Sequence, residues 1–222
     1  MHVNQLGISH ISLRHLKSAF YVCEYKNVTR AANKLNRSQT AITKAIGELE
    51  TTLDCVLFDR SSTGMMPTVH GDALAHRVNL ALAEFERAGK TYQSYVPEGR
   101  NYQSIPVFSM DISYKRLAAF IALFQVRNIS EASKLLGVTN AAIYSSVRQM
   151  EELLDLRLFE REPDGVSPTR FAAVLALHTK LAFAEIRHAL EDLASLDGVT
   201  KGSVAIGTLP YTRNYMIPRA IN

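Results

Sequence analysis

The sequence has no tryptophan, only two cysteines and no long hydrophobic run. Apolar stretches such as 171–177 and 181–186 fall far short of the roughly 20 residues that a membrane-spanning helix needs, so we predict no membrane span. Cys23 and Cys55 lack a C-x-x-C spacing and lie among apolar neighbours, which favours buried, unreactive thiols over a redox pair or a metal site. The N-terminus lacks the features of a secretion signal, which predicts a cytoplasmic protein.

Motifs of catalysis and metal binding are missing as well. The seven histidines show no H-E-x-x-H or paired-ligand spacing, and His70 and His76 are interpreted as solvated or packing residues. No glycine-rich phosphate loop precedes a helix, and no serine lies in a nucleophile elbow. We therefore expect neither enzymatic activity nor a cofactor.

What the sequence does contain is a small excess of positive charge that is unevenly distributed. The formal net charge is +4 and the isoelectric point is near 9.1. Residues 1–95 hold 11 lysines and arginines against 8 acidic residues, whereas residues 96–196 hold 11 against 12. The charge permits a polyanionic partner and favours the first half of the chain as the place where such a partner binds.

An internal repeat organises the chain. Residues 11–85 align without gaps with residues 112–186 at an offset of 101, with 23 identities in 75 positions. The identities include Leu35 with Leu136, Ile42 with Ile143, and Glu50 with Glu151, far more than composition alone would produce. The length of the chain, 222 residues, also suits two domains. We call the two halves copy one and copy two.

The pattern within each copy predicts three helices followed by a wing. In copy one, apolar residues at helical spacing begin at Leu13, a second helix is expected from about Thr29, and a third has Ser38 as its N-cap and runs to about Leu53. The runs VLFDR, SSTGMM and PT then predict a short strand, a glycine-containing turn and a return strand. Copy two repeats this order, with Thr139 as the cap of its third helix.

The predicted fold is mainly α, with two winged helix-turn-helix domains that are each followed by a long linker helix. Long amphipathic helices are expected near 69–94 and 171–196, because apolar residues form a stripe along each. The predicted boundaries are 1–95 for the first domain with its linker helix, 96–110 for a connector that is expected to be extended, 111–196 for the second domain with its linker helix, and 197–222 for the start of a further domain.

The first turn of the third helix carries residue types that can contact DNA. A helix-turn-helix places its second helix in the major groove, where an amide can bond adenine and hydroxyls can reach bases or phosphates. Any one of these residues could be an ordinary solvated side chain, but the constellation recurs in order twice. The candidate DNA-contacting residues of copy one are Thr29, Arg30, Arg37, Ser38, Gln39, Thr40, Thr43, Lys44, Arg60 and Ser61.

The stretch NVTRAANKLNRSQTAITKAIGELETTLDCVLFDRSSTGMMPTVHGDAL resembles the winged helix-turn-helix of LysR-type transcriptional regulators. Their signature runs T-x-A-A, S-Q-P-A-(V/I)-S-x-x-I-x-x-L-E, L-G-x-x-L-F-x-R and L-T-x-x-G. The resemblance implies that the residues from Ser38 to Lys44 named above face the groove and that Arg60 lies at the wing. Thr40 replaces the usual proline, and Asp54 with Cys55 stands where Asp or Gly is normal. The implied partner is double-stranded operator DNA.

Copy two keeps the overall pattern of the family motif but differs from it at the positions expected to contact bases. Its candidate DNA-contacting residues are Thr139, Asn140, Ala141, Tyr144, Ser145, Arg148 and Arg161. Its predicted wing carries Glu160, Glu162 and Asp164, which match phosphate poorly. We therefore expect copy one to read DNA more strongly, while copy two reads a second half-site weakly or serves as scaffold. The alternative is that copy two, or the whole chain, is a winged-helix module for protein interaction.

Residues 197–222 resemble the opening of the LysR-type effector domain, which has an α/β fold like that of periplasmic binding proteins. Ser203–Ile206 would form its first strand, and its first helix would begin at Tyr215. Because the sequence stops close to where such a domain begins, a small-molecule effector is expected only for an intact longer protein.

The resemblance also implies self-association through antiparallel pairing of the linker helices. This chain contains two such helices, so they could pair within the chain as a pseudo-dimer or between chains as a homodimer. The sequence leaves both arrangements open.

Overall fold

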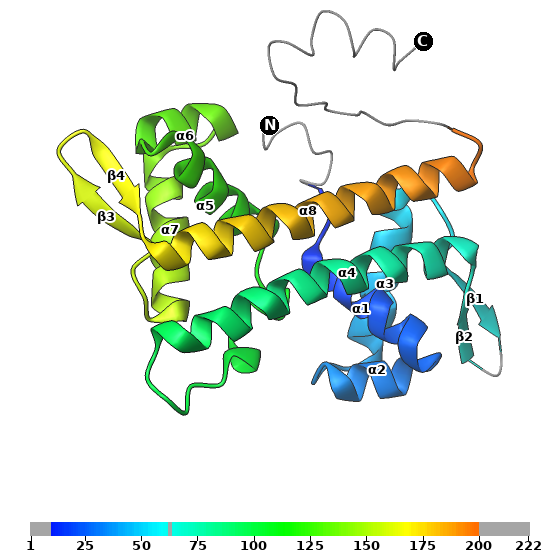
Figure 1. The fold of residues 1–222 in the computed structure, drawn as a ribbon. Helices are drawn as coiled ribbons and strands as arrows, with labels where there is room; N and C mark the ends of the chain where they lie inside the picture. The colour runs from blue at the N-terminus through cyan, green and yellow to red at the C-terminus, as the bar shows by residue number, and fades with distance from the viewer. Residues whose placement is uncertain (1–9, 62–63, 200–222) are drawn as a thin grey trace, which may run out of the picture.

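The computed structural model describes residues 10–61 and 64–199, in which two winged helix-turn-helix units flank a pair of long helices (Figure 1). Copy one contains α1 (Leu13–Tyr25), α2 (Val28–Lys34), α3 (Gln39–Leu53), the wing strands β1 (Phe58–Ser61) and β2 (Gly64–Pro67), and the linker helix α4 (Val69–Tyr92). Copy two contains α5 (Tyr114–Val126), α6 (Ile129–Leu136), α7 (Asn140–Leu154), β3 (Phe159–Glu162), β4 (Gly165–Pro168) and the linker helix α8 (Arg170–Leu196). The predicted fold class is confirmed.

Side-chain caps fix where the helices begin. The Ser38 hydroxyl accepts a hydrogen bond from the Ala41 amide at 3.1 Å, and the Thr139 hydroxyl caps α7 in the same way, so both predicted caps are confirmed. Helix α2 begins one residue earlier than Thr29, because the side chain of Asn27 accepts from the amide of Arg30.

A partly buried glutamate holds the root of each wing. Glu50 Oε1 accepts hydrogen bonds from the amides of Leu57 at 2.9 Å and Phe58 at 3.2 Å. Glu151 makes the same two bonds in copy two. The strands β1 and β2 then pair antiparallel, with Phe58 opposite Pro67, and β3 pairs with β4 in the equivalent register. Each wing therefore leaves its recognition helix at a fixed point.

Helices α4 and α8 pack side by side and antiparallel along most of their length (Figure 1). Their buried residues recur with the three-and-four spacing of a coiled coil. In α4 these residues are Leu74, Val78, Ala81, Phe85, Ala88 and Tyr92, and in α8 they are Leu175, Thr179, Ala182, Ile186, Ala189 and Leu193.

Equivalent residues of the two copies make equivalent polar contacts across the helix pair. Arg77 of α4 lies 3.0 Å from Glu185 of α8, and His178, which is the counterpart of Arg77, lies 2.8 Å from Glu84, which is the counterpart of Glu185. Arg77 also reaches Asp192 at 2.7 Å. The contacts therefore repeat about a pseudo-twofold axis, as expected of a dimer whose two subunits have been joined into one chain.

The connector is packed rather than extended, so that expectation was wrong. Tyr102 begins a short 3₁₀ helix that ends at Ser104, and the ring of Phe108 lies 5.2 Å from that of Tyr92. Five residues of the connector are buried: Tyr102, Ile105, Val107, Phe108 and Met110. Their burial removes apolar surface from water, which outweighs the tendency of the neighbouring Pro, Gly and polar residues to keep the segment open.

Residues 10–61 and 64–199 contain neither a membrane-spanning helix nor a cluster of metal-ligating side chains. No helix there is long and apolar enough to cross a membrane, and no three or more His, Cys, Asp or Glu side chains gather as they would around a metal ion. The strand expected at Ser203–Ile206 and the helix expected from Tyr215 lie outside the described residues.

Candidate nucleic-acid interface

The first turn of α3 presents a polar surface to solvent. Ser38, Gln39 and Thr40 are exposed. The Ser38 hydroxyl is engaged as the helix cap, whereas the side chains of Gln39 and Thr40 make no hydrogen bond with the described part of the chain. The amide of Gln39 therefore keeps its donors and its acceptor available for an adenine edge.

Burial of the opposite face fixes the orientation of α3. Ile42, Ile46 and Leu49 are at most 1% exposed, and they lock the helix against its own domain. Thr43 is half-buried beside them, and Lys44 is exposed and lies 3.7 Å from Glu48, one helical turn away. An exposed pair of this kind is weak, so Lys44 can exchange Glu48 for a phosphate at little cost.

Three further candidates of copy one surround this surface. Thr29 and Arg30 lie exposed in the first turn of α2, and Arg37 is half-buried in the turn before α3. The proximity of Arg37 contributes, after burial, to lowering the pKa of His15. The turn before α3 thus places the cation of Arg37 near the N-terminal end of this helix, where backbone amides also favour an anion.

The wing of copy one offers one arginine. Arg60 lies in β1, is 58% exposed at its side chain, and approaches the partly buried Glu50 at 3.5 Å. Ser61 ends β1 opposite Gly64. The carboxylate of Glu50, which holds the root of the wing, therefore also orients the guanidinium of Arg60.

The equivalent surface of copy two is engaged within the protein. Asn140 follows the Thr139 cap, and its side-chain oxygen accepts from the Ser133 hydroxyl at 2.6 Å. Its side-chain nitrogen donates to the Ser130 hydroxyl at 3.2 Å. Copy one has Ala32 at the position of Ser133, which leaves Gln39 without the corresponding bond. The amide that would read a base in copy two is thus already held by α6.

The other candidates of copy two also differ from those of copy one. Ala141 has no polar side-chain atom, and Tyr144 is 48% exposed. Ser145 accepts a hydrogen bond from Gln149 at 3.2 Å, and Arg148 is tied to Glu152 at 2.9 Å. The hydrogen bond to Glu152 raises the pKa of Arg148, so its charge is retained but directed along the helix.

Acidic residues flank Arg161 along the second wing. Glu160, Glu162 and Asp164 are all exposed, and Arg161 lies among them in β3. In copy one, Ser61 stands where copy two has Glu162. This wing is therefore less suited to phosphate than that of copy one.

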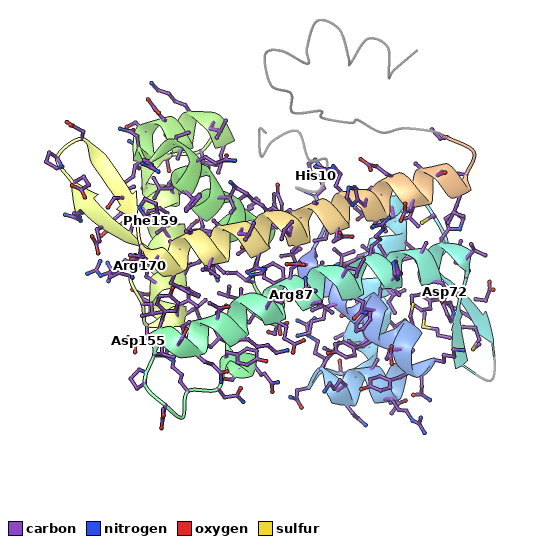
Figure 2. All side chains as sticks on the ribbon, viewed as in Figure 1. His10, Asp72, Arg87, Asp155, Phe159 and Arg170 are labelled. Carbon is purple, nitrogen blue, oxygen red and sulfur yellow. The ribbon has the colours of Figure 1, made fainter. Side chains whose placement is uncertain are left out.

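The two units stand at opposite ends of the helix pair. Asp72 marks the start of α4 on the side of the first wing, and Asp155 lies near the far end of α4, where it pairs with Arg100 at 2.7 Å (Figure 2). Each copy thus presents its own recognition helix and wing at a separate place on the molecule.

Comparison with known families agrees with this geometry. The profile described as "Bacterial regulatory helix-turn-helix protein, lysR family" matches residues 13–72 and again residues 114–173. The chain belongs to the LysR family. Each match begins with α1 or α5 and ends just inside the long helix, so it contains the whole recognition surface and wing of that copy.

Curated members of the LysR family resemble the chain over different lengths. The HTH-type transcriptional regulator GalR of Pseudomonas putida is 28% identical over 95% of this chain, which corresponds to 51% of its own length. The regulator SyrM of Rhizobium etli is 39% identical over 36% of this chain and 24% of its own length, and GbpR of Azospirillum brasilense is 33% identical over 44% and 29%. This chain thus spans about half or less of these relatives. No solved structure matches it.

Sequence reasoning missed two features of this LysR-type interface. One is the pair of hydrogen bonds by which Glu50 and Glu151 hold the wings. The presence of a glutamate at the equivalent position of both copies was the sequence signal for it. The other is the bonding of Asn140 to Ser130 and Ser133, for which the hydroxyls on the preceding helix were the signal.

Proposed function

We propose that this LysR-type chain binds operator DNA in a sequence-specific manner and that copy one is the stronger reader. The observation that carries the proposal is the contrast between Gln39 and Asn140. Gln39 is exposed at a capped helix end with its amide unengaged by the described residues, whereas the amide of Asn140 bonds to Ser130 and Ser133. Reading a base with Asn140 requires those bonds to be broken or shared, which lowers the net gain.

Charge supports the same ranking. Copy one offers Arg30, Arg37 and Lys44 around the start of α3. Copy two has Glu131 in place of Arg30, Val138 in place of Arg37 and Ser145 in place of Lys44. Because phosphate contacts supply most non-specific affinity, their loss weakens copy two on any DNA sequence.

The pairing of α4 with α8 suggests how the two copies act together. In the proposed arrangement one chain is a pseudo-dimer, in which the helix pair holds two recognition helices as a homodimer would hold them. Copy two then contacts a second half-site weakly and thereby fixes the position of copy one along the DNA. A homodimer formed through the same helices would instead carry four helix-turn-helix units.

The proposal is tested by footprinting on the DNA beside the gene of this protein, together with two matched variants. Gln39→Ala is expected to weaken operator binding about tenfold or more at fixed salt, because a bidentate amide contact to a base is worth about 1–3 kcal/mol. Asn140→Ala is expected to change affinity less than threefold, since that amide is engaged within the protein. Equal losses, or a larger loss for Asn140→Ala, would contradict the ranking of the copies.

Salt dependence and molecular size complete the test. Lys44→Gln is expected to reduce the slope of log affinity against log salt by about one, as the loss of one phosphate contact does. Sedimentation of the protein with one operator duplex is expected to show one chain per duplex. Two chains per duplex would favour the homodimer, and unchanged affinity in all three variants would favour a protein-interaction role instead.

A further inference from the structure

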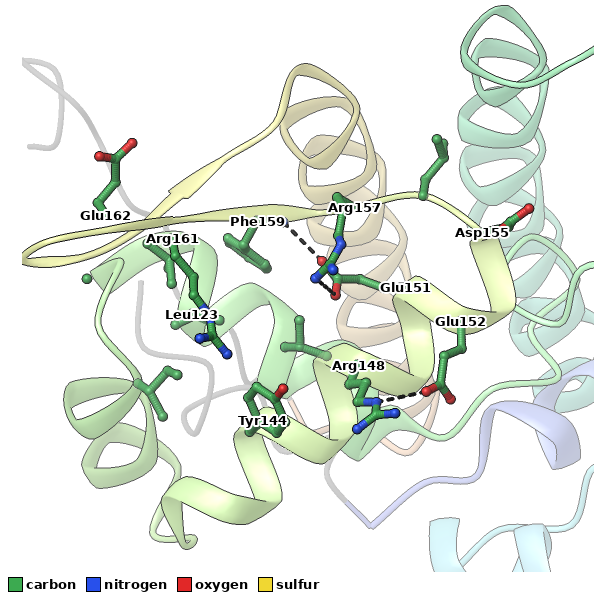
Figure 3. A pocket seen from close by; sticks show the side chains of 15 residues that line it. Leu123, Tyr144, Arg148, Glu151, Glu152, Asp155, Arg157, Phe159, Arg161 and Glu162 are labelled. Atoms are coloured by element: carbon green, nitrogen blue, oxygen red, sulfur yellow. Dashed lines mark hydrogen bonds and ion pairs between the residues drawn. The ribbon is translucent and has the colours of Figure 1, made fainter.

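A hollow of about 810 Å³ lies between α7 and the wing of copy two (Figure 3). Its apolar lining comes from four elements and includes both aliphatic and aromatic side chains. These residues are Leu123, Ile129, Tyr144, Val147, Phe159 and Val166. A volume of this size is typical of sites that hold small organic ligands, which are lined mainly by apolar side chains with a few polar groups.

The lining also holds three arginines and the four carboxylates of Glu151, Glu152, Asp155 and Glu162, of which Glu162 points away from the hollow (Figure 3), and one of the arginines is unpaired. The guanidinium of Arg161 points inward toward Leu123 and Tyr144 (Figure 3) and makes no ion pair with the residues that the structure describes. The two other arginines of the lining are each matched by a carboxylate. Arg148 lies 2.9 Å from Glu152, and Arg157 lies 3.9 Å from Glu151.

Comparison with copy one explains why Arg161 is unpaired. In copy one the wing arginine Arg60 approaches Glu50 at 3.5 Å. In copy two the equivalent carboxylate, Glu151, faces Arg157, which occupies the position of Val56. Glu151 thus pairs with Arg157, and Arg161 faces the hollow instead. The strands of the two wings pair in the equivalent register, so this difference comes from the side chains at these positions.

Two other residues of the hollow also differ from their counterparts in copy one. Tyr144 stands where copy one has Thr43, and Leu156 stands where copy one has Cys55. Both changes enlarge the apolar surface beside Arg161. The positions that would approach a DNA groove in copy one have thus become a mixed apolar and cationic lining in copy two.

We propose that this hollow binds a small organic acid, in which one carboxylate pairs with Arg161 and an aliphatic body lies against Leu123, Tyr144 and Val147. A guanidinium matches a carboxylate through two parallel hydrogen bonds, and apolar contact supplies the remaining affinity. An extended polyanion fits less well, because the wing also carries Glu160, Glu162 and Asp164. The site is independent of DNA binding by copy one and goes beyond the function proposed above.

The test uses the full chain and three probes of equal length: hexanoate, 1-hexanol and hexylamine. Nuclear magnetic resonance titration is expected to show hexanoate binding at millimolar concentrations, with shifts at Tyr144 and Val147. Arg161→Gln is expected to weaken hexanoate binding about tenfold, because a hydrogen bond to a charged group is lost. The matched variant Arg60→Gln, at the equivalent position of copy one, is expected to leave it unchanged.

Three results would overturn the proposal. The first is equal weakening by Arg161→Gln and Arg60→Gln, and the second is binding of 1-hexanol as tightly as hexanoate. The third is a short DNA duplex that shifts Tyr144 when hexanoate does not, which would assign the hollow to DNA. Tyr144→Thr places the residue of copy one in an exposed position, so folding is retained, and it is expected to weaken hexanoate and 1-hexanol alike.

Discussion

The hydroxyl of Tyr92 donates a hydrogen bond of 2.6 Å to the backbone carbonyl of Leu154. Tyr92 ends the linker helix of copy one, and Leu154 ends the recognition helix of copy two. The last carbonyls of a helix have no partner within it, so the tyrosine satisfies an acceptor that burial would otherwise leave open. Both residues are fully buried. One side chain therefore joins the two copies at the base of α7.

Replacing Tyr92 with phenylalanine removes this bond and keeps the ring. Tyr92→Phe is expected to lower the free energy of unfolding by about 1 kcal/mol or more, because a buried carbonyl loses its partner. Urea denaturation followed by circular dichroism measures the change. Tyr95→Phe is the control, since Tyr95 is 40% exposed and should unfold like the wild type. If both variants match the wild type, the bond does not contribute to stability.

The cross-helix ion pairs make a second prediction. Arg77→Ala loses contacts with both Glu185 and Asp192, and we expect the free energy of unfolding to fall by about 1 kcal/mol, the upper range for a partly exposed pair. Lys90→Ala is the matched control, because Lys90 is exposed and, among the described residues, pairs with Glu86 of its own helix. Thermal melting at low and high salt checks both variants. A larger effect of Lys90→Ala would contradict the importance of the cross-helix contacts.

Two glycines of copy one should respond in opposite directions. Gly47 lies within α3 with open space around it, so Gly47→Ala is expected to stabilise the protein by about 0.5–1 kcal/mol through helix propensity. A methyl group at Gly89 would overlap the ring of Tyr102, so Gly89→Ala is expected to displace the connector and lower the melting temperature. Limited proteolysis near Arg100 should then become faster. Stabilisation by Gly89→Ala would show that the ring does not pack there.

The thiols of the folded protein should react slowly. Burial raises the pKa of Cys23 to about 12 and that of Cys55 to about 11. The reactive thiolate is therefore scarce at neutral pH, and alkylation by iodoacetamide is expected to be slow until urea unfolds the chain. Mass spectrometry should find Cys55 modified before Cys23, because Cys55 is half-buried and has the lower pKa. Rapid modification of Cys23 in the folded protein would contradict its burial.

His15 should make stability depend on pH. Burial lowers its pKa below the ordinary value of 6.5, so the unfolded chain binds the proton more tightly than the folded chain. The stability that neutral His15 contributes is present above pH 6.5 and is lost as the pH falls from there toward the folded pKa. Urea unfolding at several pH values should show a shallower loss for His15→Gln than for the wild type. An identical pH dependence would remove His15 as its source.

Local structure was largely predictable from the sequence, because its causes are local. Ser38 and Thr139 are caps that act on amides three residues away, and both helices begin where these residues predict. The wings could be predicted from Gly64 and Gly165, which have positive φ angles at the turn between the paired strands. Because the two copies align at a constant offset, each element predicted in one copy also predicted its equivalent in the other.

Contacts between elements were predicted less well. The connector was expected to be extended because Pro97, Gly99 and polar residues dominate its pattern, and the burial of Tyr102 depends on the space that Gly89 leaves in α4. The engagement of Asn140 depends on how α6 crosses α7, which brings Ser130 and Ser133 to its amide. Neither arrangement follows from the periodicity of a single segment.

The choice between helix pairing within and between chains could not be made from the sequence either, because α4 and α8 carry the same apolar spacing. Contacts near the connector support the proposed pairing within the chain. Lys17 of α1 lies 2.6 Å from Asp111, and Arg14 donates to the Asp111 carbonyl. These bonds hold the start of copy two against copy one.

The union of α4 and α8 within one polypeptide has a consequence for behaviour on dilution. A complex of two separate subunits dissociates as its concentration falls, and its melting temperature falls with it. A helix pair contained in a single molecule has no such dependence, because its halves remain tethered at a constant effective concentration. In the proposed pseudo-dimer, the two recognition helices would therefore stay paired even when a cell holds only a few of these molecules.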